Sequence, residues 1–87
     1  MYINVSLQAV KAVERIVESA RAMLIGNYNN FSTDIQNTLS EWNDANVQKF
    51  IQLFGSMTGD LKDVILRLNG IESFCREVER LIIAYNG

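Results

Sequence analysis

The chain has 87 residues, of which 48% are hydrophobic and 21% are charged, and its net charge is −2. This length allows one domain, and the composition is that of a folded protein rather than a disordered one. The eight Lys and Arg residues are spread among acidic residues, so the concentrated basic face that nucleic-acid binding requires is missing. We also expect no membrane insertion, because no run approaches the roughly 18 apolar residues that cross a bilayer.

The first half of the chain is predicted to form a helix over about residues 4–41. Apolar residues recur at steps of three or four from Val5 to Trp42, which is the spacing of one helix face. The weakest part is the segment Gly-Asn-Tyr-Asn-Asn at residues 26–30, because Gly and Asn are poor helix formers. We expect one long helix with a weak middle. Two shorter helices, the second capped by residues 32–34, are the alternative.

The strongest break in the pattern is the turn at residues 42–45. Either Asn43 or Asp44 can accept a backbone N–H bond at the start of the next helix, so the first helix is expected to end near Glu41. A short connection between two long helices places them side by side and antiparallel. The ring of Trp42 is then expected to fold back onto the first turns of the second helix, near Phe50.

The second helix is predicted over about residues 46–85. Its apolar residues form an unbroken seam with a period of about 3.5, the a/d pattern of helices that wind around each other. Three glycines, Gly55, Gly59 and Gly70, lie off this seam, and a local kink at residues 55–60 is left open. The seam consists of Val47, Phe50, Phe54, Met57, Leu61, Val64, Leu68, Ile71, Cys75, Val78, Ile82 and Tyr85.

Both helices carry apolar residues beyond a single seam, and a lone hairpin would leave many of them in water. At about 25 cal/mol per Å2 this loss amounts to several kcal/mol, comparable with the total stability of so small a domain. We therefore predict an all-α antiparallel helical hairpin that pairs with another hairpin into a four-helix-bundle dimer. The residues expected at the core and dimer interface are Leu24, Phe31, Ile35, Leu53, Phe54, Leu61, Ile65, Leu68 and Phe74.

Residues that commonly carry enzyme chemistry are scarce in this sequence. Histidine is absent and Cys75 is the only cysteine, which excludes a Cys–His nucleophile and the usual zinc sites. No glycine-rich phosphate-binding motif is present. We expect a protein that is not an enzyme and that binds no cofactor or metal. The close acidic pairs Asp60/Asp63 and Glu77/Glu79 are interpreted as parts of solvated helix faces.

The segment W-N-D-A-N-V-Q-K-F at residues 42–50 resembles the turn of the W-x-G family of small secreted bacterial proteins, the early-secreted-antigenic-target-like proteins. Trp42, Asp44 and Phe50 match the family spacing W-x-[GD]-x5-[FY]. The resemblance covers nearly the whole chain, as two helices of about forty residues around a central turn. It implies a dimeric hairpin exported by a type VII (ESX-like) machine, as a substrate or as the partner of a larger toxin. Trp42 and Asp44 would shape the turn, and Phe50 would pack beside it.

Two features depart from the family pattern. Asp44 stands where Gly is commoner, and Tyr85 is followed only by Asn86 and Gly87, so the family's Y-x-x-x-D/E export signal is missing. Four explanations of the missing signal are left open: a partner chain supplies it, the protein uses another signal, the sequence is truncated, or the protein is not secreted. Residues 1–5 do not resemble a signal peptide. We expect secretion without a cleaved leader, with a cytoplasmic helical adaptor as the alternative, and a homodimer or a heterodimer is equally compatible with the sequence.

Overall fold

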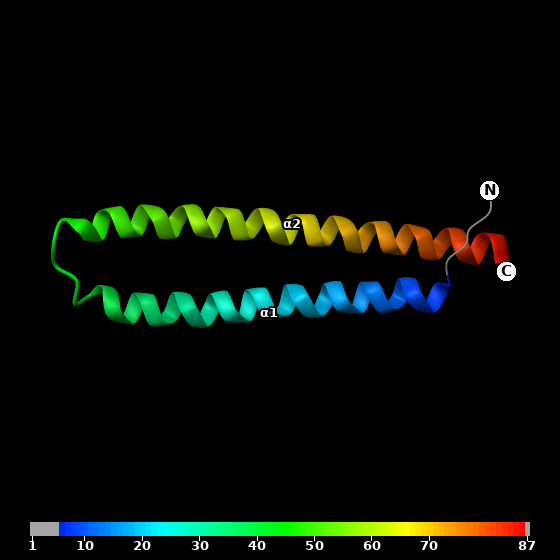
Figure 1. The fold of residues 1–87 in the computed structure, drawn as a ribbon, viewed down its shortest axis with the longest axis horizontal. Helices are drawn as coiled ribbons and strands as arrows, with labels where there is room; N and C mark the ends of the chain where they lie inside the picture. Colours follow the sequence, from blue (N-terminus) through cyan, green and yellow to red (C-terminus); the bar gives the residue numbers. More distant parts are fainter. Residues whose placement is uncertain (1–5, 87) are drawn as a thin grey trace.

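The computed structural model describes residues 6–86, which form two long helices. Helix α1 spans Leu7–Leu39 and helix α2 spans Asn46–Asn86, and residues 40–45 connect them. The helices lie side by side and antiparallel over their whole length, so the molecule measures 64 × 19 × 13 Å (Figure 1). The predicted all-α antiparallel hairpin is confirmed. The expected start of the first helix at residue 4 lies outside the described residues.

Helix α1 begins at a side-chain cap and runs without a break through its weak middle. The hydroxyl of Ser6 accepts a hydrogen bond from the backbone N–H of Ala9 at 3.0 Å, which satisfies one of the free donors at the helix start. Residues 26–30 are helical throughout, so the prediction of one long helix is confirmed. Contacts from α2 support this stretch. The stacked rings of Tyr28 and Phe54 have centroids 6.0 Å apart, and the hydroxyl oxygens of Tyr28 and Thr58 are hydrogen-bonded at 2.7 Å.

The first helix ends at Leu39, two residues before the predicted end near Glu41. The backbone N–H of Glu41 donates to the carbonyl of Thr38, and that of Trp42 donates to the carbonyl of Leu39, both at 3.0 Å. These tighter three-residue bonds replace the last turn of the α-helix. The chain therefore turns earlier than the apolar periodicity indicates.

Helix α2 is continuous from Asn46 to Asn86, and its glycines do not interrupt it. A Cβ placed on Gly55, Gly59 or Gly70 would meet no atom within 4 Å. The three glycines therefore lie away from the helix interface, as their position off the seam predicts. The packing of the opposite side of α2 compensates for their low helix propensity.

The core between the two helices is thin. The buried residues are Val10, Val17, Glu72, Cys75 and Ile82, and no large side chain is more than 98% buried. Two helices share only one line of contact, so most apolar side chains next to that line keep part of their surface in water. The interior of the hairpin alone is therefore small for a chain of this length.

Four of the twelve residues of the predicted α2 seam stay exposed in the hairpin. Met57, Val64 and Ile71 keep 41%, 43% and 46% of their surface exposed, and Tyr85 keeps 57%. The physical reason is that α1 is a single neighbour and lies to one side of the apolar stripe. Most of the α2 residues that are buried or half-buried follow two interleaved series at steps of seven. The first series is Phe54, Leu61, Leu68, Cys75 and Ile82, and the second is Thr58, Ile65, Glu72 and Glu79.

Candidate interaction surface

Three shallow hollows follow one another along the same side of the hairpin, between α1 and α2. The α2 residues Met57, Ile71 and Val78 are separated by multiples of seven, so they lie on one face of the helix. No charged side chain lines any of the three hollows. Their lining residues are Val10, Val13, Ile71, Phe74, Cys75 and Val78 in the first, Leu24, Asn27, Tyr28, Phe31, Met57 and Leu61 in the second, and Ile35, Thr38, Leu39, Trp42 and Phe50 in the third.

This side, which we call the apolar face, consists of the residues of the three hollows together with Val64, which lies seven residues from both Met57 and Ile71. Several of its side chains are well exposed, with Phe74 at 68% and Phe31 at 46%, whereas Val10 and Cys75 are buried. Single exposed apolar residues are common on protein surfaces, but a contiguous stripe of them marks a surface that contacts another molecule. The apolar face is therefore the candidate functional site of this chain.

The opposite side of the hairpin is closed by ion pairs. Glu72 on α2 is buried, and its Oε1 accepts a hydrogen bond from Arg76 Nη2 at 2.5 Å. Its Oε2 forms an ion pair with Arg21 Nη1 of α1 at 2.8 Å. The same nitrogen of Arg21 donates a hydrogen bond to Asn69 Oδ1 at 2.7 Å. Arg76 also reaches back to Glu14 of α1 at 3.3 Å. The two helices are thus linked by charge on this side and by apolar contact on the other.

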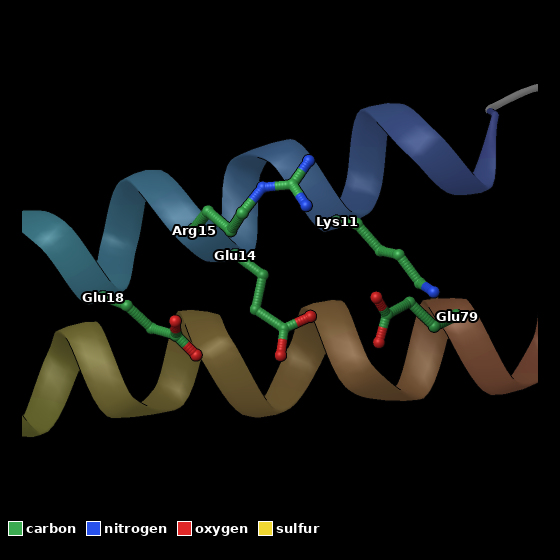
Figure 2. A pocket seen from close by; sticks show the side chains of 5 residues that line it. All are labelled: Lys11, Glu14, Arg15, Glu18 and Glu79. Atoms are coloured by element: carbon green, nitrogen blue, oxygen red, sulfur yellow. The ribbon is translucent and has the colours of Figure 1, made fainter.

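A charged hollow continues this side toward the chain ends. It is lined by Lys11, Glu14, Arg15, Glu18 and Glu79. Figure 2 shows Glu14 and Glu18 extending from α1 toward α2, and Lys11 extending toward Glu79. Its charged groups are costly to bury against an apolar partner.

Glu79 is the residue whose ionisation this hollow alters. Partial burial raises the pKa of Glu79, and the neighbouring carboxylate of Glu14 raises it further by hydrogen bonding and charge repulsion. Lys11 and Arg76 act in the opposite direction by attraction. The net shift is upward, so the charged form of Glu79 is disfavoured in the folded hairpin.

The turn brings Trp42, Asp44 and Phe50 together. Asp44 Oδ1 accepts two hydrogen bonds of 2.8 Å, one from the indole Nε1 of Trp42 and one from the backbone N–H of Asn46. Of the two candidates for capping the second helix, Asp44 is therefore the one that does so. The ring of Trp42 packs on Phe50 at 5.5 Å.

From this turn an aromatic ladder extends into the hairpin. The ring centroids of Phe50 and Phe54 lie 6.1 Å apart. The centroid of Phe54 lies 6.0 Å from that of Tyr28 and 5.8 Å from that of Phe31, both on α1. The contacts of this ladder fix the two helices against each other near the turn. The ion pairs of Glu72 do the same near the chain ends.

The residues predicted for the core and dimer interface fall into two groups. Phe31, Leu53 and Phe74 are exposed, at 46%, 61% and 68%. The structure thus brings one group into the hairpin and leaves the other on its surface. The half-buried group consists of Leu24, Ile35, Phe54, Leu61, Ile65 and Leu68.

The sequence analysis missed the cluster around Glu72. A signal for part of it was present, since Glu72 and Arg76 are four residues apart and so adjacent on a helix. The cross-helix partners Glu14, Arg21 and Asn69 depend on the register of the hairpin, which the sequence pattern alone does not fix. Among residues 6–86, no group of three or more His, Cys, Asp or Glu side chains is arranged to hold a metal ion.

No helix within the described part of the chain is long and apolar enough to cross a membrane. No protein-family model, curated protein or solved structure matches this chain. What the structure does define is a class: an extended helical hairpin with exposed apolar faces, a form that indicates association with partners.

Proposed function

We propose that this chain is a non-enzymatic association protein whose apolar face packs against a second helical hairpin to form a four-helix bundle. The observation that carries the proposal is the difference between the two sides of the hairpin. One side has its charges paired around Glu72, and the other exposes Met57, Val64, Ile71 and Phe74. A molecule that remained alone in water would gain nothing from this separation.

The dimensions of the molecule fit such a role. It is 64 Å long and 19 Å wide, and a stable specific interface covers about 800 Å2 on each partner. A hairpin of similar length lying along the apolar face would cover that much surface. It would also bury Met57, Val64 and Ile71, three of the four α2 seam residues that stay exposed in the hairpin.

The association is tested by placing a charge at the centre of the face. Ile71→Asp should abolish association, because the carboxylate would be buried in an apolar interface without a partner. Leu66→Asp is the matched control, since Leu66 is 66% exposed but lies on the outer side of α2. Light scattering after size exclusion gives the mass of each species. If wild type and both variants are monomeric at high concentration, and no hairpin partner binds, the proposal is wrong.

We further propose that the protein acts in type VII secretion, as an exported substrate or as the companion of a larger toxin. The resemblance of the W-x-[GD]-x5-[FY] segment supports this, as does the arrangement of Trp42, Asp44 and Phe50 around the turn. The alternative, an intracellular helical adaptor, would use the same apolar face and differ in location.

Fractionation of a producing strain separates these two roles. The secretion role predicts protein in the medium that disappears when the type VII ATPase is deleted. Protein confined to the cytosol while that machine is intact would contradict it and favour the adaptor.

A further inference from the structure

We infer that the occupant of the apolar face is a second copy of this chain, with the two α2 helices antiparallel and a two-fold axis beside Val64. This inference rests on the proposed association and specifies its partner and geometry. In such a dimer the turns of the two hairpins lie at opposite ends of the bundle. The argument comes from the order of side chains along α2.

The packing of α1 determines which side of α2 remains free. Thr58, Ile65 and Glu72, at steps of seven, are half-buried or buried on the α1 side. The stripe Met57, Val64 and Ile71 faces the open side, with a second row at its outer edge. In a four-helix bundle each helix uses one flank for one neighbour and the other flank for the next. The outer row is Leu53, Asp60, Arg67 and Phe74.

Read from either end, this outer row has an apolar residue first and a charged residue second, and its two charges are opposite in sign. When two copies run antiparallel about a point between residues 63 and 64, Leu53 faces Phe74 of the second copy. Asp60 then faces Arg67 of the second copy, and each of these contacts occurs twice. Apolar residues meet apolar residues, and opposite charges meet.

The inner stripe has the same symmetry. Its centre is Val64, half a residue from the centre of the outer row, so that Met57 faces Ile71 of the second copy and Val64 faces Val64 of the second copy across the axis. A two-fold interface requires one patch to complement itself, and this patch does so at every level from residue 53 to residue 74. A parallel pairing would instead place Asp60 against Asp60 and Arg67 against Arg67, which is repulsive.

The two charges of the outer row are available for this contact. Asp60 and Arg67 are exposed, and neither takes part in an ion pair within residues 6–86. By contrast, Glu14, Arg21, Glu72 and Arg76 on the other side are already paired within the hairpin. In the proposed dimer, Asp60 and Arg67 of one copy would therefore face Arg67 and Asp60 of the second copy.

Charge reversal tests the pairing. Asp60→Arg should raise the dimer dissociation constant by roughly tenfold, because two attractive contacts become repulsive at once. The double variant Asp60→Arg/Arg67→Asp should restore the wild-type constant, since the opposite charges again face each other. Lys62→Asp is the control, because Lys62 is exposed and lies four residues before Leu66 on the outer side of α2, so this variant should leave the constant unchanged. Sedimentation equilibrium measures all four proteins.

Cross-linking tests the position of the axis independently. In a Cys75→Ala background, Val64→Cys should form an intermolecular disulfide readily, because the two introduced thiols meet at the axis. Leu66→Cys should not, although Leu66 is more exposed than Val64 (66% against 43%), because it lies on the outer side of α2. Circular dichroism of each variant verifies that the hairpin is intact.

The outcomes separate this inference from the proposed function. A dimer in which the double charge variant gives no rescue and Val64→Cys does not cross-link would overturn the antiparallel arrangement, with association itself upheld. A monomer that pairs only with a different hairpin would overturn the second copy as partner and again uphold association. A monomer that pairs with nothing would overturn both.

Discussion

Asp44 joins the turn and the second helix through a single carboxylate oxygen. That oxygen accepts the backbone N–H of Asn46 and the indole N–H of Trp42, both at 2.8 Å. The first bond satisfies a donor at the start of α2, and the second holds the Trp42 ring against Phe50. One side chain thus sets both the helix start and the position of the largest aromatic residue.

Asp44→Ala should therefore lower the free energy of unfolding by about 1 kcal/mol, the usual cost of removing a helix cap. Urea unfolding followed by circular dichroism measures the loss, and the Trp42 fluorescence should shift as the ring is released. Asn43→Ala is the control at the neighbouring position. Equal stability of the two variants would show that the Asp44 bonds contribute nothing.

Glu79 is a residue whose charge opposes folding. Its pKa is raised, first by burial and then by Glu14. A carboxyl group with a raised pKa in the folded state binds its proton more tightly there than in the unfolded chain. Its contribution to stability is present at acid pH and is lost as the pH rises through the raised pKa.

Glu79→Gln should accordingly raise the melting temperature at pH 7, and the advantage over wild type should shrink as the pH falls and the native carboxyl becomes protonated. Thermal melts from pH 7 to pH 4 give both curves. An advantage of Glu79→Gln that grew toward acid pH would contradict the assignment.

At the scale of the helices, register is fixed at two places by different physics. Near the turn the aromatic ladder of Trp42, Phe50, Phe54, Tyr28 and Phe31 spans α1 and α2. Near the chain ends the ion pairs of Glu72 do so. Apolar helix stripes alone can slide by a turn at little cost, whereas a buried carboxylate without its partners is costly.

Removal of this carboxylate should weaken the hairpin. Glu72→Ala leaves Arg21 without its cross-helix partner and opens a small void, and we expect a loss of about 1–3 kcal/mol, reduced from the fully buried case because Arg76 is 59% exposed. Glu77→Ala is the control, because its pair with Arg80 is exposed on both sides. Denaturant titration of both variants should show a clear difference, and similar losses would refute a special role of Glu72.

At the scale of the whole molecule, the stability of the folded hairpin is coupled to its association with a partner. The hairpin has few buried side chains, and Met57, Ile71 and Phe74 stay exposed on its apolar face. Burial of that face in a dimer stabilises the folded state by mass action, so the stability depends on protein concentration.

We therefore expect the melting temperature to rise by several degrees when the protein concentration is raised a hundredfold. Differential scanning calorimetry or circular dichroism at a series of concentrations measures the rise. Ile71→Asp, which cannot bury its carboxylate in the interface, should melt at the same lower temperature at every concentration. A wild-type melting temperature independent of concentration would show that the folded state is monomeric.

The sequence by itself determined the helical hairpin. Apolar steps of three and four define the helices, the absence of proline leaves them unbroken, and the polar residues at the corner place the turn, because these signals are local. The continuity of α1 through residues 26–30 was predictable as a preference, and the contacts of Tyr28 with α2 show its physical basis.

Only the tertiary structure decided which apolar residues face α1 and which stay exposed. The stripe on α2 is wide enough for two neighbours, and its periodicity is the same whichever side the first neighbour occupies. The position of α1 assigns Thr58, Ile65 and Glu72 to the hairpin and leaves Met57, Val64 and Ile71 on the open face. That choice depends on contacts between residues far apart in the sequence, such as Tyr28 with Thr58 and Arg21 with Glu72, which no local pattern encodes.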